Sequence, residues 1–179
     1  MFNERYGLQS AVFEGRKTQT RREPFYCDKE IGCVLNKKGK LECYNDYNGN
    51  PIHTSRYAVG EIVAISERYN DSMQDGSISS FDKGWKNKMF VKAEFMPSKI
   101  QIKNIRCERL QDISESDCIK EGVRCYSTNS FVIWDYEKSE CFRFYTAKEC
   151  FLYLLNLVSK KEHRTINPYV IVYEFELVD

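Results

Sequence analysis

The sequence of 179 residues lacks several features that mark common functional classes. It has no excess of charge, because 27 basic residues nearly balance 26 acidic ones. Nucleic-acid binding would therefore need a local basic patch. No apolar run approaches the roughly 20 residues that span a bilayer, and the opening segment lacks the apolar stretch of a signal peptide. We therefore expect a soluble cytoplasmic protein with no membrane partner.

Histidine is also scarce, which limits the ways in which the chain can bind a metal. Only His53 and His163 are present, and the eight cysteines include no CxxC pair, so the usual zinc spacings are absent. The set closest to a ligand group comprises Cys27, Cys33, Cys43 and His53. We interpret the cysteines as reduced thiols, several of them in the core. We expect neither a metal site nor a cofactor.

A basic segment at 15–22, with the sequence GRKTQTRR, is the most distinctive stretch that is present. Four of the seven residues after the glycine are basic and none is acidic. In a regular strand, alternate side chains share a face, so one face would carry Arg16, Thr18, Thr20 and Arg22 and the other Lys17, Gln19 and Arg21. A segment without an apolar face is either a solvated edge or the lining of a site for an anionic group.

The remaining pattern predicts a mixture of helices and strands. We expect helices at 4–14, 115–121 and 147–159, with Ser114 and Thr146 as caps of the second and third. Strands are expected at 32–35, 41–44, 62–67, 89–95, 100–110 (with a slip near Asn104) and 169–177, and a long surface loop at 70–87. The order has no regular βαβ alternation. It therefore predicts an α+β domain around a small, mostly antiparallel, barrel-like sheet.

Three separated segments resemble the ASCH domain, a member of the PUA-like pseudobarrel group. They are the first helix running into GRKTQTRR, the segment RLQDIS at 109–114 continuing to Glu121 and Gly122, and the strand NPYV at 167–170 with Phe175. The segment YAVGE at 57–61 is similar to the family's "vGD" turn. The resemblance implies a single ASCH domain over 1–179: a mostly antiparallel β pseudobarrel with flanking helices and insertions at about 25–56, 70–87 and 123–145. The nearest likeness is to the larger phage and prophage ASCH proteins.

The same resemblance implies a protein that binds RNA or a modified nucleoside. Small bacterial ASCH enzymes hydrolyse N4-acetylcytidine, a linear amide, with a lysine, a threonine three residues later and a distant glutamate. These match Lys17, Thr20 and Glu121. The chemistry of amide hydrolysis makes Lys17 the candidate base, Thr20 the candidate nucleophile, and Glu121 either the proton donor for the leaving nitrogen or a group that orients the base edge. Substrate or RNA contacts are predicted for Arg16, Arg21, Arg22 and Glu67.

Three alternatives stand beside an amidohydrolase. One is a non-catalytic RNA-binding or phage accessory module that uses the same residues without turnover. Another is a purely structural role, in which the basic side chains of the strand pair with Glu67, Glu108 and Glu121. The third is a protein–protein adaptor that uses the aromatic segment at 123–145. A catalytic site that contains both Lys17 and Thr20 also conflicts with strand alternation, because a regular strand places these two side chains on opposite faces. The catalytic hypothesis therefore predicts a bulge or a tight bend after Gly15.

Overall fold

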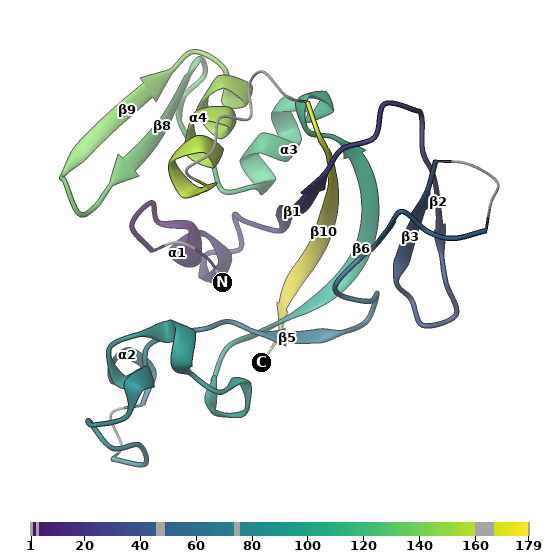
Figure 1. Cartoon of the computed structure of the whole chain (residues 1–179). Helices are drawn as coiled ribbons and strands as arrows, with labels where there is room; N and C mark the ends of the chain where they lie inside the picture. Colours follow the sequence, from purple (N-terminus) through teal and green to yellow (C-terminus); the bar gives the residue numbers. More distant parts are fainter. Residues whose placement is uncertain (1, 3, 46–48, 74–75, 160–166, 179) are drawn as a thin grey trace.

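The central element of the fold is a curled antiparallel sheet (Figure 1). This computed structural model describes residues 2, 4–45, 49–73, 76–159 and 167–178. The sheet has the order β1-β10-β6-β5, and its strands are β1 (Gln19–Phe25), β10 (Tyr169–Val178), β6 (Lys99–Arg109) and β5 (Ile62–Ala64). Every pairing is antiparallel, and the sheet forms a half-barrel. The predicted α+β class with mostly antiparallel sheets is thus confirmed.

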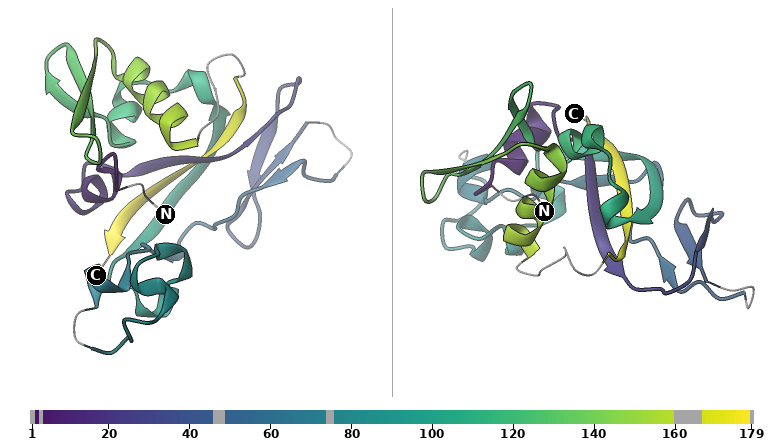
Figure 2. Two further views of the ribbon diagram at one scale, coloured as in Figure 1. Left: turned by 60° about the vertical axis from the view of Figure 1, so that its left-hand side comes forward. Right: turned by 90° about the horizontal axis from the view of Figure 1, so that it is seen from above.

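Two three-stranded antiparallel sheets lie beside the central one, both within segments that we expected to be insertions. The first contains β2 (Gly32–Leu35), β3 (Leu41–Tyr44) and β4 (His53–Thr54), and the second contains β7 (Arg124–Ser127), β8 (Ser130–Asp135) and β9 (Glu140–Phe144). The first sheet packs next to β6, and the second packs against α4 (Figure 2). Strands in the second sheet were not predicted.

Four α-helices and four 3-10 turns complete the described part of the chain. The helices are α1 (Leu8–Phe13), α2 (Tyr69–Ser72), α3 (Glu115–Lys120) and α4 (Ala147–Ser159), and the turns are η1 (Lys83–Trp85), η2 (Lys88–Phe90), η3 (Ala93–Phe95) and η4 (Leu110–Asp112). The predicted caps are confirmed, since Ser114 Oγ accepts from Asp117 N and Thr146 Oγ1 from Glu149 N, each at 3.1 Å. None of the described helices is long and apolar enough to cross a membrane.

The predicted strand at 89–95 is wrong, because this segment forms η2 and η3. Its backbone donors find local partners instead of a neighbouring strand: Met89 N donates to the Asn87 side chain at 3.0 Å, and Lys92 N donates to the Tyr69 hydroxyl at 2.8 Å. The segment at 70–87, expected to be loop, also contains part of α2 and η1. The slip near Asn104 is confirmed, because the β10–β6 register shifts between Glu174 and Phe175.

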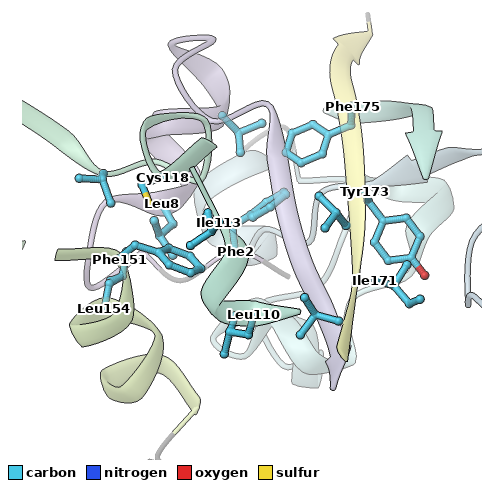
Figure 3. Close-up of a cluster of buried hydrophobic side chains, with 14 of the residues drawn as sticks. Phe2, Leu8, Leu110, Ile113, Cys118, Phe151, Leu154, Ile171, Tyr173 and Phe175 are labelled. Atoms are coloured by element: carbon cyan, nitrogen blue, oxygen red, sulfur yellow. The ribbon is translucent and has the colours of Figure 1, made fainter. Parts of the chain in front are cut away.

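Buried apolar side chains pack on both faces of the central sheet (Figure 3). Leu8 of α1 and Phe151 of α4 lie on the helix side, whereas Ile171 and Tyr173 of β10 point to the opposite side, the face that Ile171 shares with its register partner Cys107. Burial of a side chain of this size contributes about 1.5–3 kcal/mol relative to exposure. This packing fixes the N-terminal end of β1 between the helices and β10.

Candidate functional site

The approach to β1 is held by backbone contacts on three sides. Gly15, at φ +70°, turns the chain out of α1, as a residue without a Cβ does most readily. Lys17 N then donates to Ala11 O at 2.8 Å, and Thr18 N donates to Lys120 O of α3 at 2.9 Å. From Gln19 onward the strand pairs with β10. The basic segment is therefore an ordered strand entry rather than a solvated edge.

Lys17 is buried, with only 3% of its side chain exposed, and its amine is fully hydrogen-bonded. Nζ lies 2.7 Å from each of three oxygens: Gln19 O, Glu121 O and Glu121 Oε2. An ammonium has three donors, so this geometry is that of the protonated amine. Burial lowers the pKa of Lys17, while the Glu121 carboxylate opposes that shift.

Glu121 occupies the end of α3, where Gly122 lets the chain turn away at φ +103°. A side chain at position 122 would meet Leu8 at 3.1 Å and the Lys17 stem at 3.4 Å, so glycine allows the close approach of lysine. The second oxygen of Glu121 accepts from Arg21 Nη1 at 3.0 Å. The one buried carboxylate thus binds two buried cations.

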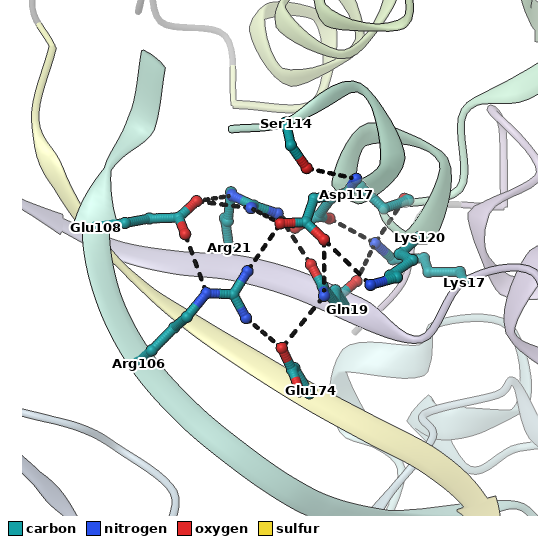
Figure 4. Close-up of polar contacts among 10 residues, drawn as sticks. Lys17, Gln19, Arg21, Arg106, Glu108, Ser114, Asp117, Lys120 and Glu174 are labelled. Atoms are coloured by element: carbon teal, nitrogen blue, oxygen red, sulfur yellow. Dashed lines mark hydrogen bonds and ion pairs between the residues drawn. The ribbon is translucent and has the colours of Figure 1, made fainter. Parts of the chain in front are cut away.

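Arg21 connects this pair to a wider network on the same face of the sheet (Figure 4). Its guanidinium contacts Glu108 at 2.6 Å, and Arg106 joins Glu108, Asp117 and Glu174. Burial lowers the pKa of Arg21, but the neighbouring carboxylates outweigh it and the net shift is upward. The network holds four carboxylates, from Glu108, Asp117, Glu121 and Glu174, and four cations, from Lys17, Arg21, Arg106 and Lys120.

Two of the cavities along β1 adjoin at Thr20. The smaller one, of about 50 Å³, is lined by Lys17, Thr20 and Glu121 together with apolar side chains of α1 and α4. The larger one, of about 210 Å³, lies between β1 and the β5–β6 side of the sheet. Thr20 and Arg22 border both cavities. Within the described residues, no hydrogen bond engages the Thr20 hydroxyl.

Of the bulge or tight bend that we expected after Gly15, the structure shows a turn at Gly15 itself, and Lys17 and Thr20 border one cavity without a bulge between them. The chain bends at Gly15, yet the alternation persists, with Lys17, Gln19 and Arg21 buried and Thr20 half-buried. β1 is an edge strand, with β10 on only one side. Side chains from both faces reach a cavity that lies along its free edge. The bulge in β1 comes later, between Arg22 and Phe25.

That later bulge builds the polar wall of the larger cavity. Glu23 adopts a left-handed conformation, with φ +58°, and its carboxylate accepts from the Tyr173 hydroxyl. The same hydroxyl accepts from Arg56 N at 2.9 Å, and Tyr57 packs edge-on against the Tyr173 ring at 5.5 Å. Burial, followed by the contact with Glu23, raises the pKa of Tyr173. Sequence reasoning missed this wall, although Arg56 precedes the recognised turn segment at 57–61 and Tyr57 begins it.

The predicted binding residues separate into two groups. Arg22 borders both cavities, and Arg21 lies beside the smaller one with its guanidinium already held by carboxylates. Arg16 pairs with Glu14 at 2.6 Å and borders neither of these two cavities. Glu67 borders neither cavity as well, and one of its carboxylate oxygens is buried without a hydrogen bond in the described part of the chain.

The four residues that came closest to a ligand group in the sequence, Cys27, Cys33, Cys43 and His53, are only partly brought together. Cys33 and Cys43 lie side by side, but their third close neighbour is Cys107 and not Cys27 or His53. His53 instead contacts Glu23 at 3.1 Å, and His163 lies outside the described residues.

Taken together, the site at β1 places a hydroxyl, an amine and a carboxyl around one small cavity, with a larger aromatic-walled cavity beside it. A hydroxyl, a base and an acid are the groups that hydrolysis of an amide requires. No model of a known protein family matches the sequence, and neither the curated proteins nor the solved structures contain a match.

Proposed function

We propose that this chain is an ASCH (PUA-like) domain that binds a modified nucleoside or an RNA nucleotide at Thr20 and hydrolyses the acetyl amide of N4-acetylcytidine. The observation that supports this proposal is the shared cavity of Lys17, Thr20 and Glu121, which come from β1 and from the far end of α3. The larger cavity adjoins it at Thr20 and accepts the base. The insertions at 25–56 and 123–145 then carry the two smaller sheets.

The buried Lys17–Glu121 pair supplies both the base and the acid. Its members are 2.7 Å apart, and transfer of one proton from Nζ to Oε2 converts an ion pair into a neutral amine and a carboxylic acid. Burial disfavours separated charges, so the neutral pair is more accessible here than in water. The amine must then give up one hydrogen bond and turn its lone pair towards Thr20.

Acetyl transfer follows from that neutral pair. The Thr20 oxygen attacks the acetyl carbonyl while Lys17 takes its proton, and the carbonyl electrons move onto oxygen. As the oxyanion collapses, the bond from carbon to N4 breaks and Glu121 protonates the departing nitrogen. Cytidine leaves, the ion pair is restored and Thr20 carries an acetyl ester. Water repeats the sequence on the ester and releases acetate.

Contacts with the substrate come from the larger cavity. Its aromatic wall, formed by Tyr57 and Tyr173, offers a stacking surface for a base, and every base has a π-face. Arg22 and Arg56 line the same cavity and provide cations for a ribose or phosphate oxygen. Arg21 positions Glu121 and does not reach the substrate, because Glu108 and Glu121 occupy its guanidinium.

A second candidate function is RNA binding without turnover. The hydrogen bonding of Lys17 favours this function. An ammonium group that donates to three acceptors has no free lone pair with which to accept a proton. In this version the charge network only positions β1, and the cavities hold a nucleotide of an RNA strand. Binding would then weaken steeply with salt, because phosphate contacts release counterions.

Incubation with N4-acetylcytidine, with cytidine and acetate measured together, tests the proposal. We expect turnover by the wild type and a loss of about 10²–10⁴-fold for Lys17→Met, the usual contribution of general acid–base catalysis. Thr20→Val removes the nucleophile, and Thr18→Val, which alters a residue just before β1 and outside both cavities, is its matched control. Rapid quenching of the wild type should trap an acetyl ester.

The outcomes separate the candidates. An inert wild type at high enzyme concentration would exclude hydrolysis of this substrate. Turnover that Thr20→Val leaves intact would exclude the ester but keep the Lys17–Glu121 pair as activator of water. Salt-sensitive RNA binding without acetate release would favour the second candidate.

A further inference from the structure

Two cysteines face each other across the hairpin of β2 and β3. Cys33 and Cys43 are paired in the register, and their sulfur atoms lie 3.3 Å apart. Asn36 N donates to Lys40 O at 2.9 Å, which makes that pair hydrogen-bonded. Hydrogen-bonded and non-hydrogen-bonded pairs alternate along an antiparallel ladder, so Cys33 and Cys43 form a non-hydrogen-bonded pair, whose side chains are closest.

A third cysteine reaches the same point from the central sheet. Cys107 lies in β6, and the sulfur atoms of Cys33, Cys43 and Cys107 all lie within 4.8 Å of one another. The three differ in burial: Cys43 is buried, Cys107 is half-buried and Cys33 is exposed. The cluster is therefore anchored in the protein and open to solvent on the Cys33 side.

We propose that Cys33, Cys43 and Cys107 form a binding site for one thiophilic d¹⁰ metal ion, with Zn²⁺ as the reference ion. A tetrahedral zinc site with Zn–S bonds of about 2.3 Å needs sulfur atoms roughly 3.8 Å apart. The sulfur separations here, from 3.3 Å to at most 4.8 Å, span that value. Three protein ligands leave a fourth position on the exposed side for water or another small ligand.

A metal ion would replace the thiol protons of Cys33, Cys43 and Cys107, because the thiolate is the form of cysteine that binds metal.

His53 is not one of the proposed metal ligands. It is the register partner of Cys43 in β4, but Nε2 contacts Glu23 and its ring stacks on Phe25 at 4.6 Å. The metal would link the β2–β3 hairpin to β6, two parts of the fold that are distant in sequence. The site therefore differs from the cavities at β1 in residues and in chemistry.

Metal titration of the full-length, reduced and chelator-treated protein tests the site. We expect one Co²⁺ per chain with a sulfur-to-cobalt charge-transfer band, displaced by one equivalent of Zn²⁺. Cys33→Ser and Cys107→Ser should each weaken Zn²⁺ binding by more than the roughly 10–100-fold lost with an outer-shell partner. Cys125→Ser and Cys141→Ser, two exposed thiols in the other small sheet, are matched controls and should bind like the wild type.

Cys33 is the decisive position, because its exposure lets serine replace it without disturbing the core. Circular dichroism of each variant should confirm that the fold is retained. Failure of the wild type to bind one equivalent would overturn the proposal, and so would equal binding by wild type and Cys33→Ser. Binding that survives Cys107→Ser unchanged would also overturn it, because a two-cysteine arrangement is then sufficient.

Discussion

Strand β6 carries two polar clusters of opposite character on its two faces. Arg106 and Glu108 point into the charge network around Glu121, whereas Cys107, between them in the strand, joins Cys33 and Cys43 beside the hairpin. Strand alternation alone separates the two clusters. In the network every charge meets an opposite charge, while the cysteine cluster gathers three ligands of a single kind.

The contrast shows how a ligand-binding site differs from a charge network that only stabilises the fold. A closed network of opposite charges is complete without a ligand, and its energy lies in the desolvated contacts between its members. Three thiols compete for shared protons and gain most from a cation that all three can bind. Loss of one charged residue should therefore destabilise the charge network, and binding of a metal ion should stabilise the cysteine cluster.

The largest expected loss of stability comes from a substitution at the centre of the charge network. Glu121→Gln removes the charge that faces Lys17 and Arg21, both buried. Removal of one partner of a buried ion pair costs about 3–5 kcal/mol, because the other charge stays buried without compensation. Urea unfolding of the two proteins measures the difference. Glu176→Gln, in an exposed pair with Lys103, is the control and should cost about 1 kcal/mol or less.

A double variant sharpens that result. Lys17→Met combined with Glu121→Leu removes both buried charges, so we expect it to lose less stability than the sum of its two single variants. Strict additivity, or a Glu121→Gln cost no larger than that of Glu176→Gln, would show that the pair is not desolvated in solution.

A smaller effect of opposite sign is expected at the cysteine cluster. Zn²⁺ that binds only the folded chain stabilises it by about 2.7 kcal/mol at a free concentration one hundred times the Kd. Thermal unfolding of the wild type with and without Zn²⁺ measures this gain. Cys33→Ser should lose the gain and Cys141→Ser should keep it. A zinc effect that is equal in all three proteins would point to binding elsewhere.

Sequence patterns predicted those elements whose signals are local. Ser114 and Thr146 cap α3 and α4 as expected, and the strands expected at 32–35 and 41–44 are β2 and β3. The strand predicted at 89–95 failed because backbone donors there bond to side chains, those of Asn87 and Tyr69, and not to another strand. Propensity describes a residue's preference, whereas pairing depends on the whole sheet.

The contact between Lys17 and Glu121 could be anticipated only because a resemblance supplied the distant partner. Nothing in the spacing of Lys17 and Glu121 indicates that α3 ends beside the entry to β1, and their contact depends on the close approach at Gly122. Cys107 is a similar case, because its neighbours on the hairpin are selected by how a separate small sheet packs on β6. Tertiary packing decides both, and no local pattern encodes it.

The smallest predicted effect lies at the rim of the charge network and depends on pH. Burial pushes the pKa of Asp117 up, but Lys120, Arg106 and Arg21 outweigh it, and the net shift is downward. A depressed carboxyl pKa stabilises the fold above the unfolded-state value near 3.9 and loses that contribution as pH falls through the folded-state value. Asp117→Asn should therefore cost about 1 kcal/mol or less at neutral pH, and the difference from the wild type should shrink below about pH 4. A difference that stays constant in acid would mean that Asp117 acts through hydrogen bonds, such as the one from Gln19, rather than through its charge.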